Sequence, residues 1–413
     1  MIVLGAALIG LAAAGMAGLN FGFFIIPMSE ELGIDQSFFG WAFTARMLAF
    51  AASGFVLGRI LDRFGARVPL VVTGVIASLI LIAFSRITNG WQLILLFALI
   101  GGIGIQGAGA SLYISVPISN WFRRLRGRAM AIAFLGVPAG IFIFPILTQF
   151  LIARFGWQAA WLVLAAFAGP LLVFVGLFIM RRQPSDYGLL PDGDTSVGPE
   201  EQADDAQPPR PAAEYSWTRA QALRSPTFWR LALVLGLLQF STSSVGLFRI
   251  PHFLERDIDP TLIGFAYQGE AIASVIAGLP VGFALDRFQA RYLASATIVP
   301  RVLSVLATIY ATTALHAAAA TVLNGLAAAS FVVVQDFIWT SYFGPRHIGA
   351  IRGASLAVTL PFAATGAPLA GMVRDATGSY LPVWWASIAL LVLGSVLMLL
   401  TPKPRPPVPA PAD

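Results

Sequence analysis

The chain contains 413 residues, of which 57% are hydrophobic and 11% are charged, and its formal net charge is +6 at pH 7. A soluble globule of this length needs more polar surface than that, so the composition excludes a soluble protein. The sequence has no cysteine and three histidines, and it shows no Ser-His-Asp spacing, metal-ligand cluster or phosphate-binding loop. We therefore expect an integral membrane protein that is not an enzyme and that binds no metal or cofactor.

Long apolar runs predict transmembrane helices, because each is close to the roughly 20 residues that cross a bilayer core of about 30 Å. The runs lack the strict alternation of membrane β-barrel strands. The first run starts at the initiator methionine without a basic leader, so we expect a retained helix and not a cleaved signal peptide. The twelve predicted spans are residues 3–28, 38–60, 69–86, 92–118, 128–151, 158–180, 229–250, 262–285, 292–313, 317–342, 351–373 and 381–401.

Arginines cluster in alternate loops between these spans, and short loops rich in Lys and Arg stay cytoplasmic. We therefore expect both termini in the cytoplasm and a multi-pass protein of a cell membrane, the inner membrane of a bacterium. Orientation accounts for the basic balance, so nucleic acid is not an expected partner. The basic loops contain Arg59, Arg63, Arg67, Arg123, Arg124, Arg126, Arg128, Arg346 and Arg352.

The stretch between spans six and seven is rich in Pro, Gly and acidic residues and has too few apolar residues to fold alone. It ends in WTRAQALRSPTFWRLAL, where Trp217, Leu223, Phe228 and Trp229 stand among basic residues. This ending predicts an amphipathic segment on the membrane surface, with an irregular connection as the alternative. The predicted units are a bundle at 1–182, a linker at 183–228 and a second bundle at 229–413.

A charged decapeptide occurs twice, as GRILDRFGAR at 58–67 and as GFALDRFQAR at 282–291. We call the interval from position 58 to position 282 the repeat interval. Each copy ends an even-numbered span, and NWF at 120–122 and SYF at 341–343 repeat at nearly the same interval. The sequence therefore predicts an all-α membrane protein with twelve transmembrane helices in two pseudo-symmetric six-helix bundles.

The first copy resembles the signature loop of the major facilitator superfamily, with Gly58, Asp62, Arg63, Gly65 and Arg67 at the positions of that pattern. NWFRRLRGRAMAIAF and YFGPRHIGAIRG resemble its monocarboxylate-porter and oxalate/formate-antiporter branch. The resemblance covers essentially the whole chain and implies a transporter of small organic anions that is coupled to protons or works by exchange. Departures from the branch keep a second function open, the export of neutral or lipophilic molecules.

The repeated loop is expected to close the cytoplasmic side in one conformation. A glycine lets helices approach closely, and an aspartate can accept hydrogen bonds from the positive N-terminal end of a facing helix. The alternative is that the arginines only fix orientation. The predicted cytoplasmic gate consists of Gly58, Asp62, Arg63, Arg67, Asp286, Arg287, Asp336 and Arg346.

Charges inside predicted spans are costly and therefore normally paired or directed at a cavity. Arg46 and Glu270 are separated by the repeat interval, so they are equivalent positions of the two halves. We expect Arg46 to bind an anionic substrate, and Glu270 to pair with Arg46 in the empty site or to carry a proton. The alternative for Glu270 is a static bridge to Arg301. Arg249 and His252 are expected as exposed loop residues, with a pH-sensitive external gate as the alternative.

Polar side chains on helices that line the cavity of this fold complete the predicted substrate site. Each of them could instead join helices to one another. We expect a monomer whose partners are membrane lipids, a small organic anion and protons. The predicted substrate-binding residues are Arg46, Asn20, Tyr113, Gln106, Gln239, Gln335 and Trp339.

Overall fold

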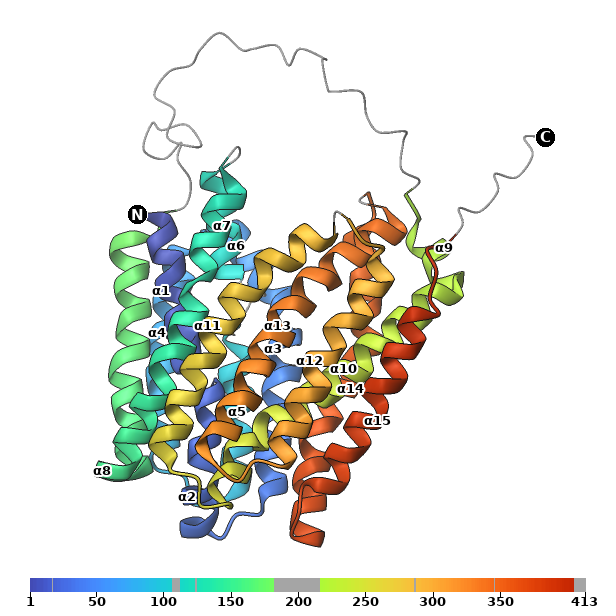
Figure 1. Cartoon of the computed structure of the whole chain (residues 1–413). Helices are drawn as coiled ribbons and strands as arrows, with labels where there is room; N and C mark the ends of the chain where they lie inside the picture. Colours follow the sequence, from blue (N-terminus) through green and yellow to red (C-terminus); the bar gives the residue numbers. More distant parts are fainter. Residues whose placement is uncertain are drawn as a thin grey trace, which may run out of the picture.

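The computed structural model describes residues 1–16, 18–105, 112–122, 125–181, 216–285, 287–344 and 346–404, and every regular element in them is a helix (Figure 1). The N-terminal half contains α1 (Ile2–Gly15), η1 (Leu19–Phe21), α2 (Gly22–Leu32), α3 (Gln36–Phe64), α4 (Arg67–Phe84), α5 (Gly90–Gly102), α6 (Leu112–Trp121), α7 (Arg126–Phe134), α8 (Gly136–Phe174) and η2 (Val175–Ile179). The C-terminal half contains α9 (Arg219–Arg224), α10 (Pro226–Leu254), α11 (Pro260–Leu285), α12 (Ala290–Ile309), α13 (Ala314–Phe343), α14 (Ile348–Thr377) and α15 (Leu381–Leu399).

The predicted spans correspond to these helices, but three of the first six are interrupted. The first span is α1 and α2 joined through η1, the fourth is α5 and α6, and the fifth is α7 followed by the start of α8. The fifth and sixth spans meet inside α8 at Gly156, whose φ of 83° and ψ of 167° are not helical. Among the described residues, seven helical stretches are long and apolar enough to cross a membrane, and one of them, 128–179, contains both the fifth and the sixth span.

The helices form two bundles with matching internal contacts. In the N-terminal bundle α3 packs on α5, α1 on the fifth-span part of α8, and α4 on its sixth-span part. In the C-terminal bundle α11 packs on α13, α10 on α14, and α12 on α15. These are the same three pairs of spans, shifted by six. The predicted all-α fold of two pseudo-symmetric bundles is therefore confirmed.

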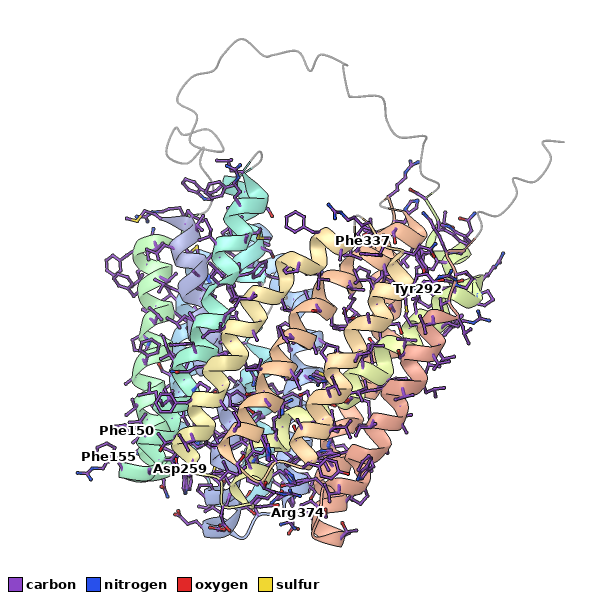
Figure 2. All side chains as sticks on the ribbon, in the orientation of Figure 1. Phe150, Phe155, Asp259, Tyr292, Phe337 and Arg374 are labelled. Atoms are coloured by element: carbon purple, nitrogen blue, oxygen red, sulfur yellow. The ribbon has the colours of Figure 1, made fainter. Side chains whose placement is uncertain are left out.

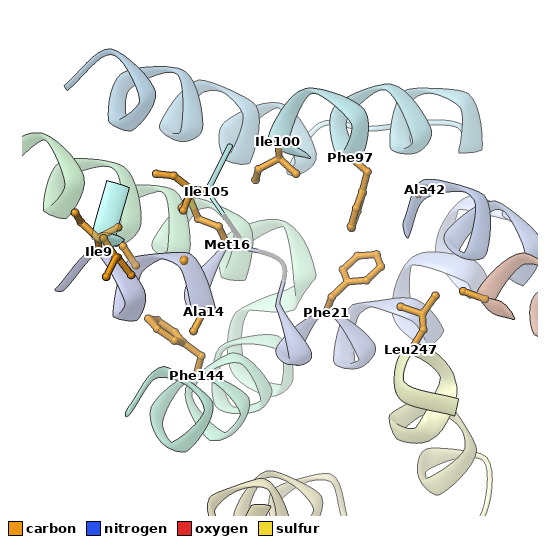
Figure 3. Close-up of a cluster of buried hydrophobic side chains, with 14 of the residues drawn as sticks. Ile9, Ala14, Met16, Phe21, Ala42, Phe97, Ile100, Ile105, Phe144 and Leu247 are labelled. Atoms are coloured by element: carbon orange, nitrogen blue, oxygen red, sulfur yellow. The ribbon is translucent and has the colours of Figure 1, made fainter. Parts of the chain in front are cut away.

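Aromatic side chains fill the core of the N-terminal bundle. The Phe21 and Phe97 rings lie 4.5 Å apart, and Trp161 stacks on Phe24 at 4.1 Å and on Phe84 at 4.7 Å. Figure 3 shows Phe21 facing Phe97 within this cluster, with Leu247 of α10 close by. Aromatic burial of this kind contributes both apolar area and ring contacts. The core therefore extends to the surface where the two bundles meet.

The exterior of both bundles is apolar. Phe150 and Phe155 of α8 are 60% and 62% exposed, and Tyr292 and Phe337 of the C-terminal bundle are 50% and 37% exposed (Figure 2). Exposed apolar surface on this scale marks a membrane-facing protein. Lipid chains would cover it without the penalty that water imposes.

The start of the C-terminal half, where an amphipathic surface segment was predicted, contacts the C-terminal bundle. Trp217 donates its backbone N–H to Phe343 O at 2.9 Å, and the two rings lie 5.7 Å apart. Phe228 is fully buried beside Trp339, whereas Trp229 is 51% exposed. The helix α9 is only six residues long, and α10 starts at Pro226. Through Trp217 and Phe228, this segment packs against the end of α13. Residues 182–215, which hold most of the predicted linker, lie outside the described residues.

Candidate functional site

The two bundles are joined at one end of the molecule. We call the end with the α2–α3, α10–α11 and α14–α15 turns the distal end, and the end with the N-terminus the proximal end (Figure 1). Asp259 and Arg374 lie at the distal end, and Tyr292 and Phe337 lie toward the proximal end (Figure 2). Hydrogen bonds join the two bundles in the distal half, including those from Thr44 to Ala364 O and from Gln268 to Phe142 O.

A carboxylate of one bundle caps a helix of the other at the distal end. Asp375 accepts hydrogen bonds from the backbone N–H groups of Gln36 and Ser37, both at 2.9 Å. These groups begin α3 and are unsatisfied within the helix itself. Asp35 occupies the N-cap position of α3 but makes no side-chain capping bond to the described residues. The cap of α3 therefore depends on contact with the C-terminal bundle.

Further polar contacts surround this cap. Arg374 forms an ion pair with Glu255 at 3.0 Å, and Gln36 Nε2 donates to the same carboxylate at 3.4 Å. The Tyr380 hydroxyl donates to Gln36 Oε1. Burial, and then the nearby Glu255 carboxylate, raise the pKa of Tyr380 above its ordinary value, so the phenol stays protonated and remains a donor. We call Gln36, Ser37, Glu255, Arg374, Asp375 and Tyr380 the distal gate.

Glycines let α3 and α14 approach closely in the distal half. A Cβ at Gly40 would collide with the backbone of Ala367 and Pro368, and a Cβ at Gly371 would collide with that of Ser37. Small residues at a helix interface permit such close contact. Residue numbers rise along α3 while they fall along α14, so the two helices are antiparallel. The distal gate is thus the polar rim of a close helix–helix contact.

The same two helices are apart at the proximal end. Among the described residues, no atom lies within 4 Å of the position that a Cβ would take at Gly54 or Gly58 of α3, or at Gly349 or Gly353 of α14. The close approach predicted for Gly58 is therefore not made in this conformation. Contact between the bundles at the proximal end stays a prediction for another conformation.

The other predicted gate residues fit this open arrangement. Arg63, Arg287 and Arg346 are exposed, and Arg67 is exposed and donates to Leu177 O of its own bundle at 3.2 Å. Asp286 and the side chains of Asp62 and Asp336 lie outside the described residues. The distal gate was not predicted from the sequence, although polar residues at the start of span two and in the DATGSY segment after span eleven signal it.

Arg46 lies between the closed and open parts of α3. It is 4% exposed and lies two residues after Thr44, which bonds Ala364 O of α14, while the open positions begin at Gly54. A Cβ at Gly101 would collide with the Arg46 carbonyl group, and a Cβ at Gly325 would collide with that of Glu270. The two glycines are separated by the repeat interval, as the two charged residues are. The equivalence of Arg46 and Glu270 therefore holds in the packing of their backbones.

Glu270 pairs with residues of its own bundle. Its Oε2 lies 3.3 Å from Arg249 Nη1, and its Oε1 accepts from Asn324 Nδ2 at 2.7 Å. Asn324 Oδ1 accepts from Arg301 Nη1. In this conformation Glu270 pairs with Arg249, whereas pairing with Arg46 was predicted. The bridge to Arg301, which was the alternative, passes through Asn324.

The expectation that Arg249 and His252 are exposed loop residues was wrong. Arg249 is 2% exposed and His252 is 5% exposed, and the His252 ring lies 4.7 Å from that of Trp384. For His252 the reason is that α10 continues to Leu254, past the predicted end of the span at residue 250, and Arg249 lies on a buried face of the same helix. Both side chains are therefore inside the bundle.

The predicted polar residues of the N-terminal bundle contact neighbouring helices. Asn20 Nδ2 donates to Thr148 Oγ1 at 3.1 Å, and the Tyr113 hydroxyl lies 2.8 Å from Thr73 Oγ1. These are the helix-to-helix contacts that were considered as the alternative. Gln106 lies outside the described residues.

Three predicted residues of the C-terminal bundle share a cavity. Gln239, Gln335 and Trp339 line a space of about 80 Å³ together with Arg352 and Thr359. Arg352 was predicted as a loop residue, but α14 begins at Ile348, so Arg352 lies within the helix and is half-buried. A basic side chain thus stands beside the predicted amides. No group of three potential metal-ligating side chains occurs among the residues that the structure describes.

Comparisons with known proteins agree with this architecture. A model of the Major Facilitator Superfamily matches residues 6–257. Monocarboxylate transporter 6 of Homo sapiens is 25% identical over 94% of this chain and 78% of that protein. Monocarboxylate transporter 13 of Bos taurus is 24% identical over 82% of this chain and 74% of that protein.

Solved structures share the fold at low sequence identity. A bacterial homologue of the human lysosomal transporter Spinster, in an inward-facing and unoccupied conformation, superposes with a TM-score of 0.73 at 14% identity and covers 97% of this chain and 96% of that chain. The nucleoside transporter NupG superposes with a TM-score of 0.70 at 15% identity and covers 97% of this chain and 98% of that chain.

Proposed function

This chain belongs to the Major Facilitator Superfamily, and we propose that it transports small organic anions of the monocarboxylate kind by alternating access. The observation that carries the proposal is the position of Arg46. A guanidinium buried at midspan, where the closed part of the bundle interface ends, is placed for a ligand that enters from the open end. Two relatives that are named as monocarboxylate transporters, and that match most of this chain, support the same substrate class.

Arg352 supplies a second cation on the opposite bundle. It lines the cavity that also contains Gln239, Gln335 and Trp339. Guanidinium groups bind carboxylates through paired, charge-assisted hydrogen bonds, and the amides and the indole can orient the rest of a small acid. Arg46 and Arg352 therefore bind substrate from the two bundles, and movement of the bundles exposes them alternately to each side of the membrane.

Glu270 is our candidate for coupling. Its carboxylate is buried and held by Arg249 and Asn324, so protonation would release both partners. A proton-coupled carrier would use this release, whereas an exchanger would leave Glu270 ionised throughout. With both termini in the cytoplasm of a bacterium, the open proximal end faces inward.

A second candidate function is the export of neutral or lipophilic molecules. An apolar cavity adjoins the polar one, since Gln335 lines both, and side chains such as Leu231, Leu238 and Ile298 surround it. Such a lining favours a hydrocarbon group. It also fits the apolar part of an organic acid.

Transport by purified protein in liposomes tests the proposal. Uptake of radiolabelled lactate, pyruvate and succinate should exceed that of empty liposomes for at least one acid. Arg46→Gln and Arg352→Gln should each weaken apparent affinity about ten- to a hundredfold, because each removes a hydrogen bond to a charged group. Arg86→Gln, which changes an exposed loop arginine, is the matched control and should transport normally.

Two results would overturn the assignment. Normal uptake by the Arg46→Gln variant would remove Arg46 from the substrate site. Stabilisation of the purified protein by neutral amphiphiles, with no response to any carboxylate, would favour the exporter. An acid that raises the melting temperature of the wild type and of Arg86→Gln, but not of Arg46→Gln, would support the anion carrier.

A further inference from the structure

A cluster of buried charges joins four helices of the C-terminal bundle. Arg249 of α10 pairs with Glu270 of α11, Asn324 of α13 bonds Glu270 through its amide nitrogen, and Arg301 of α12 bonds the amide oxygen of Asn324. The exposed fractions are 2% for Arg249, 4% for Glu270, 5% for Arg301 and 8% for Asn324. We call these four residues the buried cluster.

The buried cluster contains two cations and one anion. Arginine keeps its proton in proteins, and asparagine carries no charge. Glu270 therefore balances only one of the two guanidinium groups. The nearby Tyr267 is also buried, and its phenol interacts with Arg249 but adds no counter-charge. One positive charge remains without a counter-charge in the cluster.

Hydrogen-bond donors in the cluster are also left over. Within the described part of the chain, Nε and Nη2 of Arg249 and Nε and Nη2 of Arg301 are buried and have no hydrogen-bond partner. Buried donors in proteins nearly always have a partner. The two arginines lie on either side of the Glu270–Asn324 contact, and each keeps two buried donors without a partner.

The nature of that group follows from charge. A water molecule would accept hydrogen bonds but would leave the positive charge uncompensated in a site that solvent does not reach. A buried charge without a partner is strongly unfavourable, whereas a hydrogen-bonded ion pair is tolerated. An anion satisfies both the donors and the charge.

We propose that the buried cluster binds one small monovalent anion between Arg249 and Arg301, either chloride or the carboxylate of a small acid. This site belongs wholly to the C-terminal bundle and does not include Arg46 or Arg352. It goes beyond the proposed function, because an anion can be held here whatever the transported substrate is. An occupied site ties α10, α11, α12 and α13 together.

The test measures anion binding by the purified full chain. Melting temperature is recorded while potassium gluconate is replaced by potassium chloride at constant ionic strength, and in a second series by potassium acetate. Wild type should be stabilised in a saturable manner, because a ligand of the folded state stabilises it. Line broadening of the ³⁵Cl NMR signal measures chloride binding independently of stability.

Three variants make the test specific. Arg301→Gln removes one donor group and the excess charge and should lower the apparent affinity at least about tenfold. Arg249→Gln removes donors on the other side of the Glu270–Asn324 contact and should weaken anion binding by a similar factor. Arg291→Gln changes a half-exposed arginine on the same helix and should respond like wild type.

Each outcome decides the proposal. Chloride stabilisation without an acetate effect assigns an inorganic anion, and stabilisation by both assigns a site that also accepts carboxylates. Absence of saturable stabilisation and of ³⁵Cl broadening in wild type would refute the site, as would equal responses in wild type and Arg301→Gln. Uptake assays on Arg46→Gln report on the transport proposal separately.

Discussion

Arg46 and Glu270 illustrate what can be predicted for single residues. Their equivalent positions follow from the repeat, and the backbone contacts of Gly101 and Gly325 agree with it. The partners of Glu270 could not be predicted in the same way. They depend on how α10 and α13 are rotated against α11, and the positions of charged residues along apolar spans do not fix that rotation.

The two glycines yield a stability prediction. Gly101→Ala and Gly325→Ala each place a methyl group against a facing carbonyl group, so we expect a lower melting temperature and a loss of about 1–3 kcal/mol, as for other overpacked positions. Thermal unfolding of the purified variants measures this effect. Equal effects at the two sites would support the equivalence of the halves.

Gly246→Ala is the matched control for these substitutions. Gly246 also lies inside a helix, but among the described residues no atom is found within 4 Å of its Cβ position. Alanine there should be neutral or stabilise by about 0.5–1 kcal/mol, because alanine favours helix over glycine. A similar loss of stability at all three positions would mean that the close contacts do not set the effect.

At the level of helices, α3 and α11 differ in how they begin. Asp259 caps α11 through hydrogen bonds from Thr261 N at 2.8 Å and Leu262 N at 3.0 Å. Asp35 precedes Asp259 by the repeat interval and is its equivalent, yet Asp375 of the other bundle caps α3 instead. When the distal gate opens, Asp375 leaves, and Asp35 is positioned to take over the cap as Asp259 does.

The exchange of caps predicts opposite effects of two substitutions. Asp375→Ala removes a cap from the closed distal gate only, which destabilises that state by about 0.5–2 kcal/mol. Asp35→Ala removes the cap of the open distal gate only. Introduced into a Thr44→Cys chain, Asp375→Ala should raise the rate at which a small maleimide labels this buried cysteine, and Asp35→Ala should lower it.

The control for the labelling experiment is Asp259→Ala in the same chain. Asp259 caps α11 within its own loop, so its loss should lower stability without shifting the gate. Faster labelling with Asp35→Ala than with Asp375→Ala would contradict the exchange of caps.

Sequence patterns predict helices better than their interruptions. Hydropathy located the spans, and the repeat predicted their grouping into two bundles. The short η1 turn in the first span and the boundary between α7 and α8 inside the fifth span were not predicted, because apolar sequence is equally compatible with a straight helix and a broken one. Neighbouring helices decide between the two by satisfying the freed backbone groups.

At the scale of the whole molecule, the close contact between α3 and α14 corresponds to the arrangement in which the distal end is closed. Ser37 faces Gly371, Gly40 faces Ala367, and Thr44 bonds Ala364, so the register is continuous over the distal half. Sequence alone could not show which end is closed, because a carrier must be able to close either end. The open glycines of the proximal half continue the same helix faces.

Continuing the antiparallel register toward the proximal end brings Gly58 of α3 opposite Gly349 of α14, and both positions face open space in this conformation. We expect the two helices to meet there when the proximal end closes.

The natural chain contains no cysteine, so Gly58→Cys with Gly349→Cys introduces a single possible disulfide. Because a disulfide needs Cα atoms about 4.4–6.8 Å apart, it forms only in the proximally closed state. Oxidation of the double variant should cross-link the protein and stop transport, a reductant should restore it, and each single variant should be unaffected. Full transport by the cross-linked protein would show that these positions meet without closing the proximal end.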